Sequence, residues 1–117
     1  MDRKTVLLAD DQLDIMEDVI DGLKGTYDVE TVRCGNDAIE RIHRGGLDLI
    51  ILDNSMPPGP EGNYIARQVR NEYPNVPVVL QSGDYEKFGH LEETGIKVMS
   101  KFDWDGIVAY AKQTLGE

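Results

Sequence analysis

The sequence alternates short apolar runs with segments in which apolar residues recur every three or four positions. The runs at residues 6–9 and 49–52 are apolar at every position. A short continuous apolar run is typical of a strand that is buried on both faces of a sheet. Such a strand needs covering layers on both sides, and the intervening helical pattern supplies them. This feature therefore favours an α/β fold with a parallel sheet.

Helical spacing follows each of the apolar runs. Leu13, Met16, Ile20 and Leu23 lie three or four residues apart, on one face of a helix that we expect to end near Gly25. The same reasoning predicts further helices around residues 38–42, 65–69 and 107–115, and a weak one over 85–93. Further strands are predicted near residues 27–31, 78–80 and 96–98. The chain thus contains five strand–helix units in succession.

The apolar pattern of each strand also predicts its place in the sheet. The strands at 6–9, 49–52 and 78–80 are apolar throughout and should be central, whereas those at 27–31 and 96–98 alternate and should lie at the edges. The order 2-1-3-4-5 meets these conditions, although other orders with the same edges meet them too. We predict an α/β, doubly wound (βα)5 sandwich around a five-stranded parallel sheet. Its 117 residues suit a single domain over 1–117, with no output domain on this chain.

Composition excludes several classes of function. Twenty-two acidic against 12 basic residues give a formal net charge of −10, which argues against a nucleic-acid-binding module. No apolar run approaches the roughly 20 residues of a membrane-spanning helix, so no membrane association is expected. A single cysteine, Cys34, rules out an internal disulfide and favours a reducing compartment. We therefore expect a cytoplasmic protein.

Polar residues stand at the predicted carboxyl ends of four strands: Asp10 and Asp11, Asp53, Ser82, and Lys101. Ligands of open α/β sheets bind beyond these ends, near the point where the strand order reverses. Each residue also has a local explanation, because Asp11 or Ser82 could cap a helix and Asp53 could form an Asx-turn. Lys101 could simply be solvated. All of them, however, are predicted to converge on one crevice.

This set of side chains has a common chemistry. Three carboxylates about 5 Å apart repel one another by roughly 3 kcal/mol per pair, so either some of them are protonated or a cation lies among them. Carboxylate oxygens with room for water suit Mg²⁺. A carboxylate can also attack phosphorus and form an aspartyl phosphate. Lys101 and Ser82 could then balance the charge on the transferred phosphoryl group.

The sequence resembles the response-regulator receiver domain, the phosphoacceptor module of two-component signalling, over essentially its whole length. The residues that carry the resemblance are Asp10-Asp11, Asp53 followed by Met56-Pro57, Ser82 and Lys101. The resemblance implies that Asp53 is phosphorylated and that the chain is a signalling phosphoacceptor rather than an enzyme. It implies Mg²⁺ as the cofactor. The implied phosphodonor is a phosphohistidine on a histidine kinase or a histidine phosphotransfer protein.

The resemblance also assigns a role to each site residue. Asp10, Asp11 and Asp53 would bind Mg²⁺ together with the backbone carbonyl of Ser55. Ser82 would supply the hydroxyl that switches position on phosphorylation. Lys101 would contact the phosphoryl group.

Three features depart from the family's pattern. Phe102 replaces the usual proline after the lysine, and since a cis bond to a non-proline residue costs about 2.5–4 kcal/mol, we expect a trans bond there. Val98 replaces an aromatic residue that reorients on phosphorylation in relatives. The loop from Asp53 to Gly62 is one residue longer than usual and rich in proline, which should stiffen it.

Two alternative functions stay open at this point. A pseudo-receiver would fold in the same way and bind partners without ever being phosphorylated. An aspartate-nucleophile Mg²⁺ phosphohydrolase of the haloacid dehalogenase type would use the same nucleophile, but it needs a second aspartate two residues later. Ser55 occupies that position.

Overall fold

The structure, a computed structural model, describes residues 3–116 and has a central sheet of five parallel strands. The strands are β1 (Thr5–Ala9), β2 (Asp28–Val32), β3 (Leu49–Asp53), β4 (Val78–Ser82) and β5 (Lys97–Ser100). Their order is β2-β1-β3-β4-β5, which confirms the predicted order. β2 lies on one side of β1, and β3, β4 and β5 follow on the other side. The direction in which successive strands are added therefore reverses at β1.

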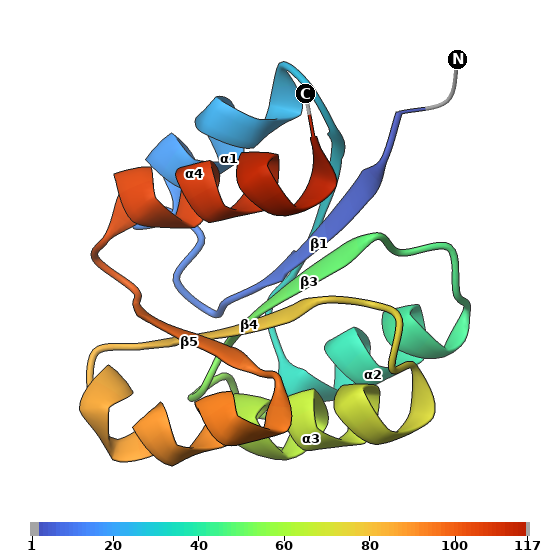
Figure 1. Ribbon diagram of the computed structural model, residues 1–117, viewed down its shortest axis with the longest axis vertical. Helices are drawn as coiled ribbons and strands as arrows, with labels where there is room; N and C mark the ends of the chain where they lie inside the picture. The colour runs from blue at the N-terminus through green and yellow to red at the C-terminus, as the bar shows by residue number, and fades with distance from the viewer. Residues whose placement is uncertain (1–2, 117) are drawn as a thin grey trace.

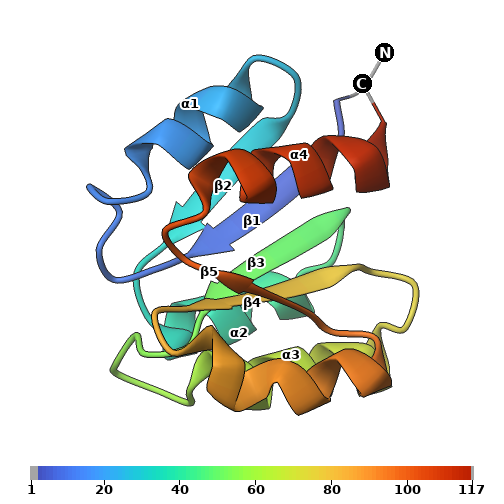
Figure 2. The same cartoon turned by 60° about the vertical axis from the view of Figure 1, so that its left-hand side comes forward.

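Helices cover both faces of the sheet (Figures 1 and 2). The helical segments are α1 (Glu17–Lys24), α2 (Gly35–His43), α3 (Gly62–Glu72), the 3₁₀ segment η1 (Tyr85–Thr94) and α4 (Trp104–Leu115). Helices α1 and α4 lie side by side on one face, and α2, α3 and η1 cover the other. None of the helices in residues 3–116 is long and apolar enough to cross a membrane.

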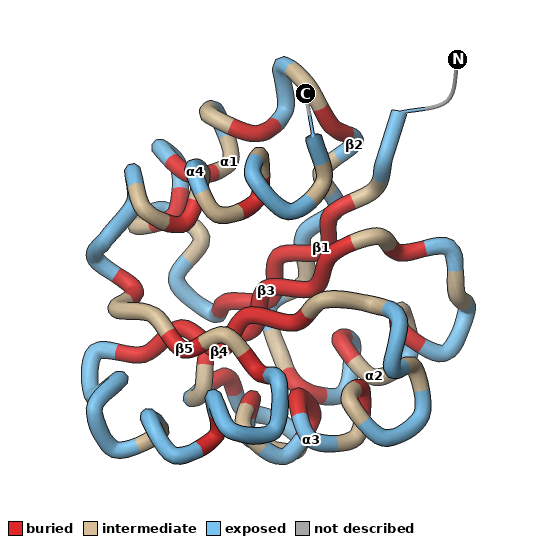
Figure 3. The backbone as a smooth tube through the Cα atoms, viewed as in Figure 1, coloured by how far each residue is buried: buried red, intermediate tan, exposed pale blue. Residues whose placement is uncertain are grey.

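Burial follows the predicted division into central and edge strands (Figure 3). Every residue of β3 and of β4 is buried, and so is β1 from Val6 onward. No residue of β2 is fully buried, since its exposed and half-buried positions mark an edge. The side chains of the central strands alternate between two apolar cores, one under α1 and α4 and one under α2, α3 and η1.

Two helical predictions were inexact. The helix expected from Leu13 begins only at Glu17, because residues 12–16 form turns with bonds such as Ile15 N–H to Gln12 O at 3.0 Å. Met16 is nevertheless fully buried, which explains the apolar spacing. The weak helix expected over 85–93 is a 3₁₀ segment, in which Leu91 is the one buried residue. Its weak apolar pattern reflects this limited packing.

The loop between β3 and α3 is fixed against the start of α2. Gly35 N–H donates to the carbonyl of Met56 at 2.9 Å, and Asn36 N–H donates to that of Pro58 at 3.2 Å. A Cβ on Gly35 would collide with the carbonyl oxygen of Pro60, so the close approach requires glycine there. The proline-rich loop is thus held beside the carboxyl end of β3.

Candidate functional site

The carboxyl ends of β1 and β3 bring three carboxylates together. Asp10 follows β1 and Asp53 ends β3, and these two strands are neighbours in the sheet. Oxygen atoms of Asp10, Asp11 and Asp53 all lie within 4.8 Å of one another. Asp10 is fully buried, Asp53 is 5% exposed, and Asp11 is open to solvent. The predicted cluster is therefore present, with two members shielded from water and one facing it.

Lys101 points into this cluster. Its Nζ lies 3.4 Å from Oδ2 of Asp10 and 3.5 Å from Oδ1 of Asp53, and the side chain is buried. The only cis peptide bond in the described part of the chain joins Pro57 to Pro58, so the Lys101–Phe102 bond is trans, as expected. Lys101 N–H donates to the carbonyl of Ser82 at 3.2 Å, which holds the residue after β5 in place without a cis proline.

Helix capping was the local explanation considered from the sequence for Ser82 and Asp11. Ser82 does not cap η1, because the residue at the N-cap is Asp84 and no side chain caps the segment. Its Oγ accepts a hydrogen bond from Asp84 N–H at 3.1 Å, and Ser82 also lines the site. Asp11 does not cap α1, because the residue at the N-cap is Met16 and no side chain caps the helix. The position of Asp11 therefore has no explanation in helix capping.

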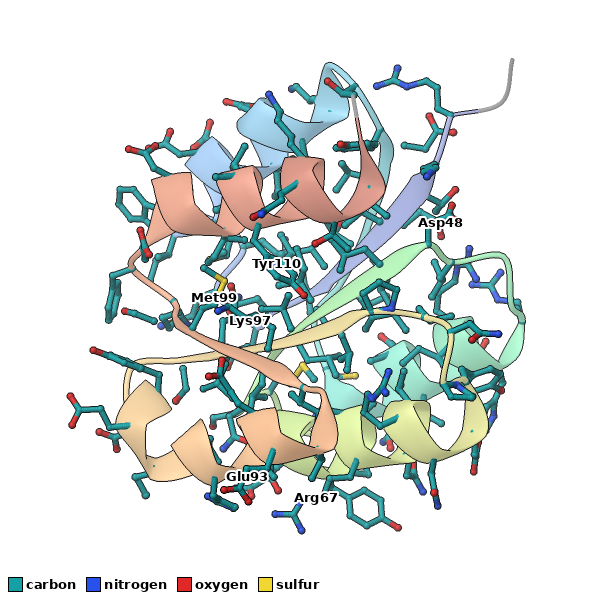
Figure 4. The ribbon with its side chains drawn as sticks, viewed as in Figure 1. Asp48, Arg67, Glu93, Lys97, Met99 and Tyr110 are labelled. Atoms are coloured by element: carbon teal, nitrogen blue, oxygen red, sulfur yellow. The ribbon has the colours of Figure 1, made fainter. Side chains whose placement is uncertain are left out.

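An open cleft of about 600 Å³ lies above the buried carboxylates. It is lined by Asp11, Gln12, Asp53, Asn54, Ser55, Ser82, Gly83, Asp84, Lys87, Phe88 and Lys101. All the side chains predicted for the site line this cleft except Asp10, which lies fully buried beside Asp53. Asp48, by contrast, directly precedes β3 and lies at the opposite end of that strand (Figure 4).

Electrostatics at the site favour a bound cation. Burial, with the charge of Asp10 as a second cause, raises the pKa of the Asp53 carboxyl from 3.8 to about 6, and Lys101 opposes this shift. One ammonium thus offsets the carboxylates only in part. Hard carboxylate oxygens beside a cleft that is open to solvent are the donor set that Mg²⁺ prefers. The residues present therefore fit that metal.

One buried polar residue at the site was not predicted. Among the described residues the buried polar or charged side chains are Asp10, Asp53, Gln81, Ser82 and Lys101. Four of them belong to the predicted site, whereas Gln81, which lies in β4 one position before Ser82, was not predicted. The available signal was a primary amide inside an otherwise apolar central strand, where an unpaired polar group costs roughly 1–3 kcal/mol.

A sequence model of the response regulator receiver domain matches residues 6–101. The chain belongs to the response-regulator receiver family. The match contains every residue proposed for the site, from Asp10 to Lys101. It also covers all five strands except for Thr5, the first residue of β1.

Solved structures share this receiver fold. The response regulator TrrA of Thermotoga maritima, solved in complex with Mg²⁺ and BeF, is 26% identical over 96% of this chain and 99% of its own, with a TM-score of 0.80. A Francisella receiver domain, from response regulator 1452, is 22% identical over 96% of both chains, with a TM-score of 0.82. DrrB of Thermotoga maritima, an OmpR/PhoB homologue, is 23% identical at a TM-score of 0.80 over 97% of this chain. The present chain covers only 52% of DrrB.

Proposed function

We propose that this receiver accepts a phosphoryl group on Asp53 from a phosphohistidine of a histidine kinase or phosphotransfer protein. Mg²⁺ would be held by Asp10, Asp11, Asp53 and the backbone carbonyl of Ser55. The modified receiver then binds a downstream protein partner differently from the free one. The cytoplasm is the compartment that we propose, on the argument from cysteine usage.

The observation that carries the proposal is the position of Lys101 between two buried carboxylates. Lys101 contacts both Asp10 and Asp53 at 3.4–3.5 Å, in a cleft wide enough for a phosphoryl group. A positive charge beside Asp53 favours its ionised form, which is the nucleophile. The same ammonium lies close enough to meet the negative charge of an arriving phosphoryl group.

Phosphoryl transfer forms one bond to phosphorus and breaks another. An oxygen of the Asp53 carboxylate forms a bond to phosphorus, while the bond from phosphorus to the histidine nitrogen breaks and the imidazole leaves with that electron pair. Lys101 and the Ser82 hydroxyl would donate to phosphoryl oxygens. When bound, Mg²⁺ supplies further neutralisation of their negative charge. No second carboxylate stands at Ser55 to activate water for turnover, which favours a signalling role over the phosphohydrolase alternative.

Phosphotransfer profiling tests this function. Histidine kinases encoded in the same genome are autophosphorylated with labelled ATP and mixed with the receiver and Mg²⁺. We expect one kinase to lose its label to the receiver within seconds, and none to label the Asp53→Asn variant. Transfer from no kinase to the unmodified receiver would instead support the pseudo-receiver alternative.

A further inference from the structure

Gln81 is a buried amide in the middle of the sheet, adjacent to the site. It lies opposite Asp53 of β3 and Met99 of β5 in the strand register. Like Val79, two residues earlier, it lies on the face of β4 that α1 and α4 cover, since its amide contacts Met16 and Val79 packs in the same core as Met16. The side chain is fully buried. Gln81 therefore occupies a buried position of the kind that an apolar residue, Val79, fills elsewhere on the same face of β4.

Gln81 contacts one residue of the carboxylate cluster, Asp10. Its Nε2 donates to Oδ2 of Asp10 at 3.0 Å, and it lies 3.6 Å from Sδ of Met16, a weak acceptor. Its Oε1 is the one buried side-chain oxygen or nitrogen in the described residues that has no hydrogen-bond partner. A methionine or leucine would fill this space without an unpaired acceptor, so filling space does not explain the amide.

The carboxylate of Asp10 is held from three directions. Oδ1 accepts from Gln12 N–H at 2.8 Å, and Oδ2 accepts from Gln81 at 3.0 Å and lies 3.4 Å from Lys101. Lys101 is shared with Asp53, at 3.5 Å. When a phosphoryl group on Asp53 attracts the ammonium, Gln81 is the donor that stays on Oδ2 of Asp10.

We infer that Gln81 is a positioning residue that fixes the orientation of the Asp10 carboxylate for Mg²⁺. This inference rests on the proposed function. Hydrogen-bond donors to metal-binding carboxylates set their direction, and their loss typically weakens metal binding about 10–100-fold. Gln81 does not line the cleft and reaches the carboxylate cluster through its bond to Asp10, so its effect passes through Asp10.

The test compares Mg²⁺ affinity in matched variants. Mg²⁺ is titrated into the unmodified receiver, Gln81→Met and Val79→Ala, and amide chemical shifts report binding. Methionine keeps the volume of glutamine without the donor, and Val79→Ala perturbs the same core without touching Asp10. We expect at least roughly tenfold weaker binding in Gln81→Met and unchanged affinity in Val79→Ala.

The other outcomes separate the inference from the function on which it rests. Equal affinity of Gln81→Met and the unmodified receiver would overturn the inference alone, and so would an equal loss in both variants. An unmodified receiver that binds no Mg²⁺ would overturn the proposed function itself.

A second measurement needs no variant and applies if Gln81→Met fails to fold. The two side-chain amide protons of Gln81 are followed by NMR in the unmodified receiver during the Mg²⁺ titration. An amide that holds Asp10 should shift together with the site. Signals that stay fixed while the Asp11 and Asp53 amides move would contradict the inference.

Discussion

Nζ of Lys101 lies 3.5 Å from Oδ1 of Asp53, although the residue after the lysine is phenylalanine and the connecting bond is trans. The hydrogen bond from Lys101 N–H to Ser82 O keeps the start of the β5–α4 loop beside β4. The direction of the lysine thus depends on pairing between β4 and β5 and not on a special peptide bond. Its positive charge offsets part of the negative charge of two buried carboxylates, Asp10 and Asp53.

Replacing Lys101 should therefore destabilise the metal-free receiver. Lys101→Met leaves Asp10 and Asp53 without their cation, which we expect to cost about 3 kcal/mol of unfolding free energy in EDTA. Saturating Mg²⁺ should recover at least half of that loss. Urea unfolding measures both values. Lys97→Met is the control, because Lys97 begins β5, the strand that Lys101 follows, and pairs with Glu92 in a half-exposed position (Figure 4). Its replacement should cost less than about 1 kcal/mol. An equal loss with and without Mg²⁺ would contradict this account.

Stability should depend on pH through Asp53. Between about pH 4 and pH 6 the folded receiver keeps a proton on Asp53 that the unfolded chain, with a pKa near 3.8, has lost. The stability that Asp53 contributes is therefore complete below about pH 4 and is lost as the pH rises through 6, by roughly 3 kcal/mol at most. Asp53→Asn cannot ionise. We expect its stability relative to the unmodified receiver to increase over this range in EDTA, as measured by urea unfolding. A difference that does not change with pH would disprove the raised pKa.

Mg²⁺ should stabilise the receiver by binding the folded state alone. Asp11 is the exposed member of the carboxylate cluster. We expect Asp11→Ala to remove most of the rise in melting temperature that Mg²⁺ produces. Asp14→Ala is the matched control, since Asp14 is an exposed acid in the same segment but does not line the cleft. A full Mg²⁺ effect in Asp11→Ala would exclude these carboxylates as the metal site.

The response to phosphorylation should centre on residues 82–93. Val98 has no ring that could reorient. Its side chain is branched and stiff, and it is buried in the core under α2, α3 and η1. Phe88, in the weakly packed η1, lines the cleft and is the aromatic that is placed to move. Amide shifts are compared between the free receiver and its beryllofluoride complex in Mg²⁺. Large shifts at Val98 and through α4, with small ones over 84–93, would refute this prediction.

The division into central and edge strands was predictable from sequence, because burial on both faces leaves an unbroken apolar run. The apolar pattern alone did not select 2-1-3-4-5 from other orders with the same edges. β3 and β4 are buried at every residue, including the apolar positions 49–52 and 78–80 that carried the prediction. The location of the site was also predictable, since the carboxyl ends of parallel strands lie at one edge of the sheet. The positions of Asp10, Asp11, Asp53, Ser82 and Lys101 at that edge were all predictable from the sequence.

Other features depended on contacts that no local pattern reports. The start of α1 at Glu17 could not be predicted, because Met16 is buried from a turn and not from a helix. The direction of Lys101 depends on its backbone bond to Ser82, 19 positions away. Gln81 was missed because its partner, Asp10, follows a different strand, β1, and is 71 residues away in sequence.

Covalent modification at Asp53 is the central claim, and intact-mass measurement tests it most directly. The receiver is incubated with acetyl phosphate and Mg²⁺, alongside Asp53→Asn and the control Asp48→Asn. Asp48 stands at the other end of the same strand, where its carboxylate accepts a hydrogen bond from Thr5 N–H at 2.8 Å (Figure 4). The account predicts that the unmodified receiver and Asp48→Asn gain the mass of one phosphoryl group, and that EDTA prevents the gain. A phosphoryl group on Asp53→Asn, or none on the unmodified receiver, would contradict it.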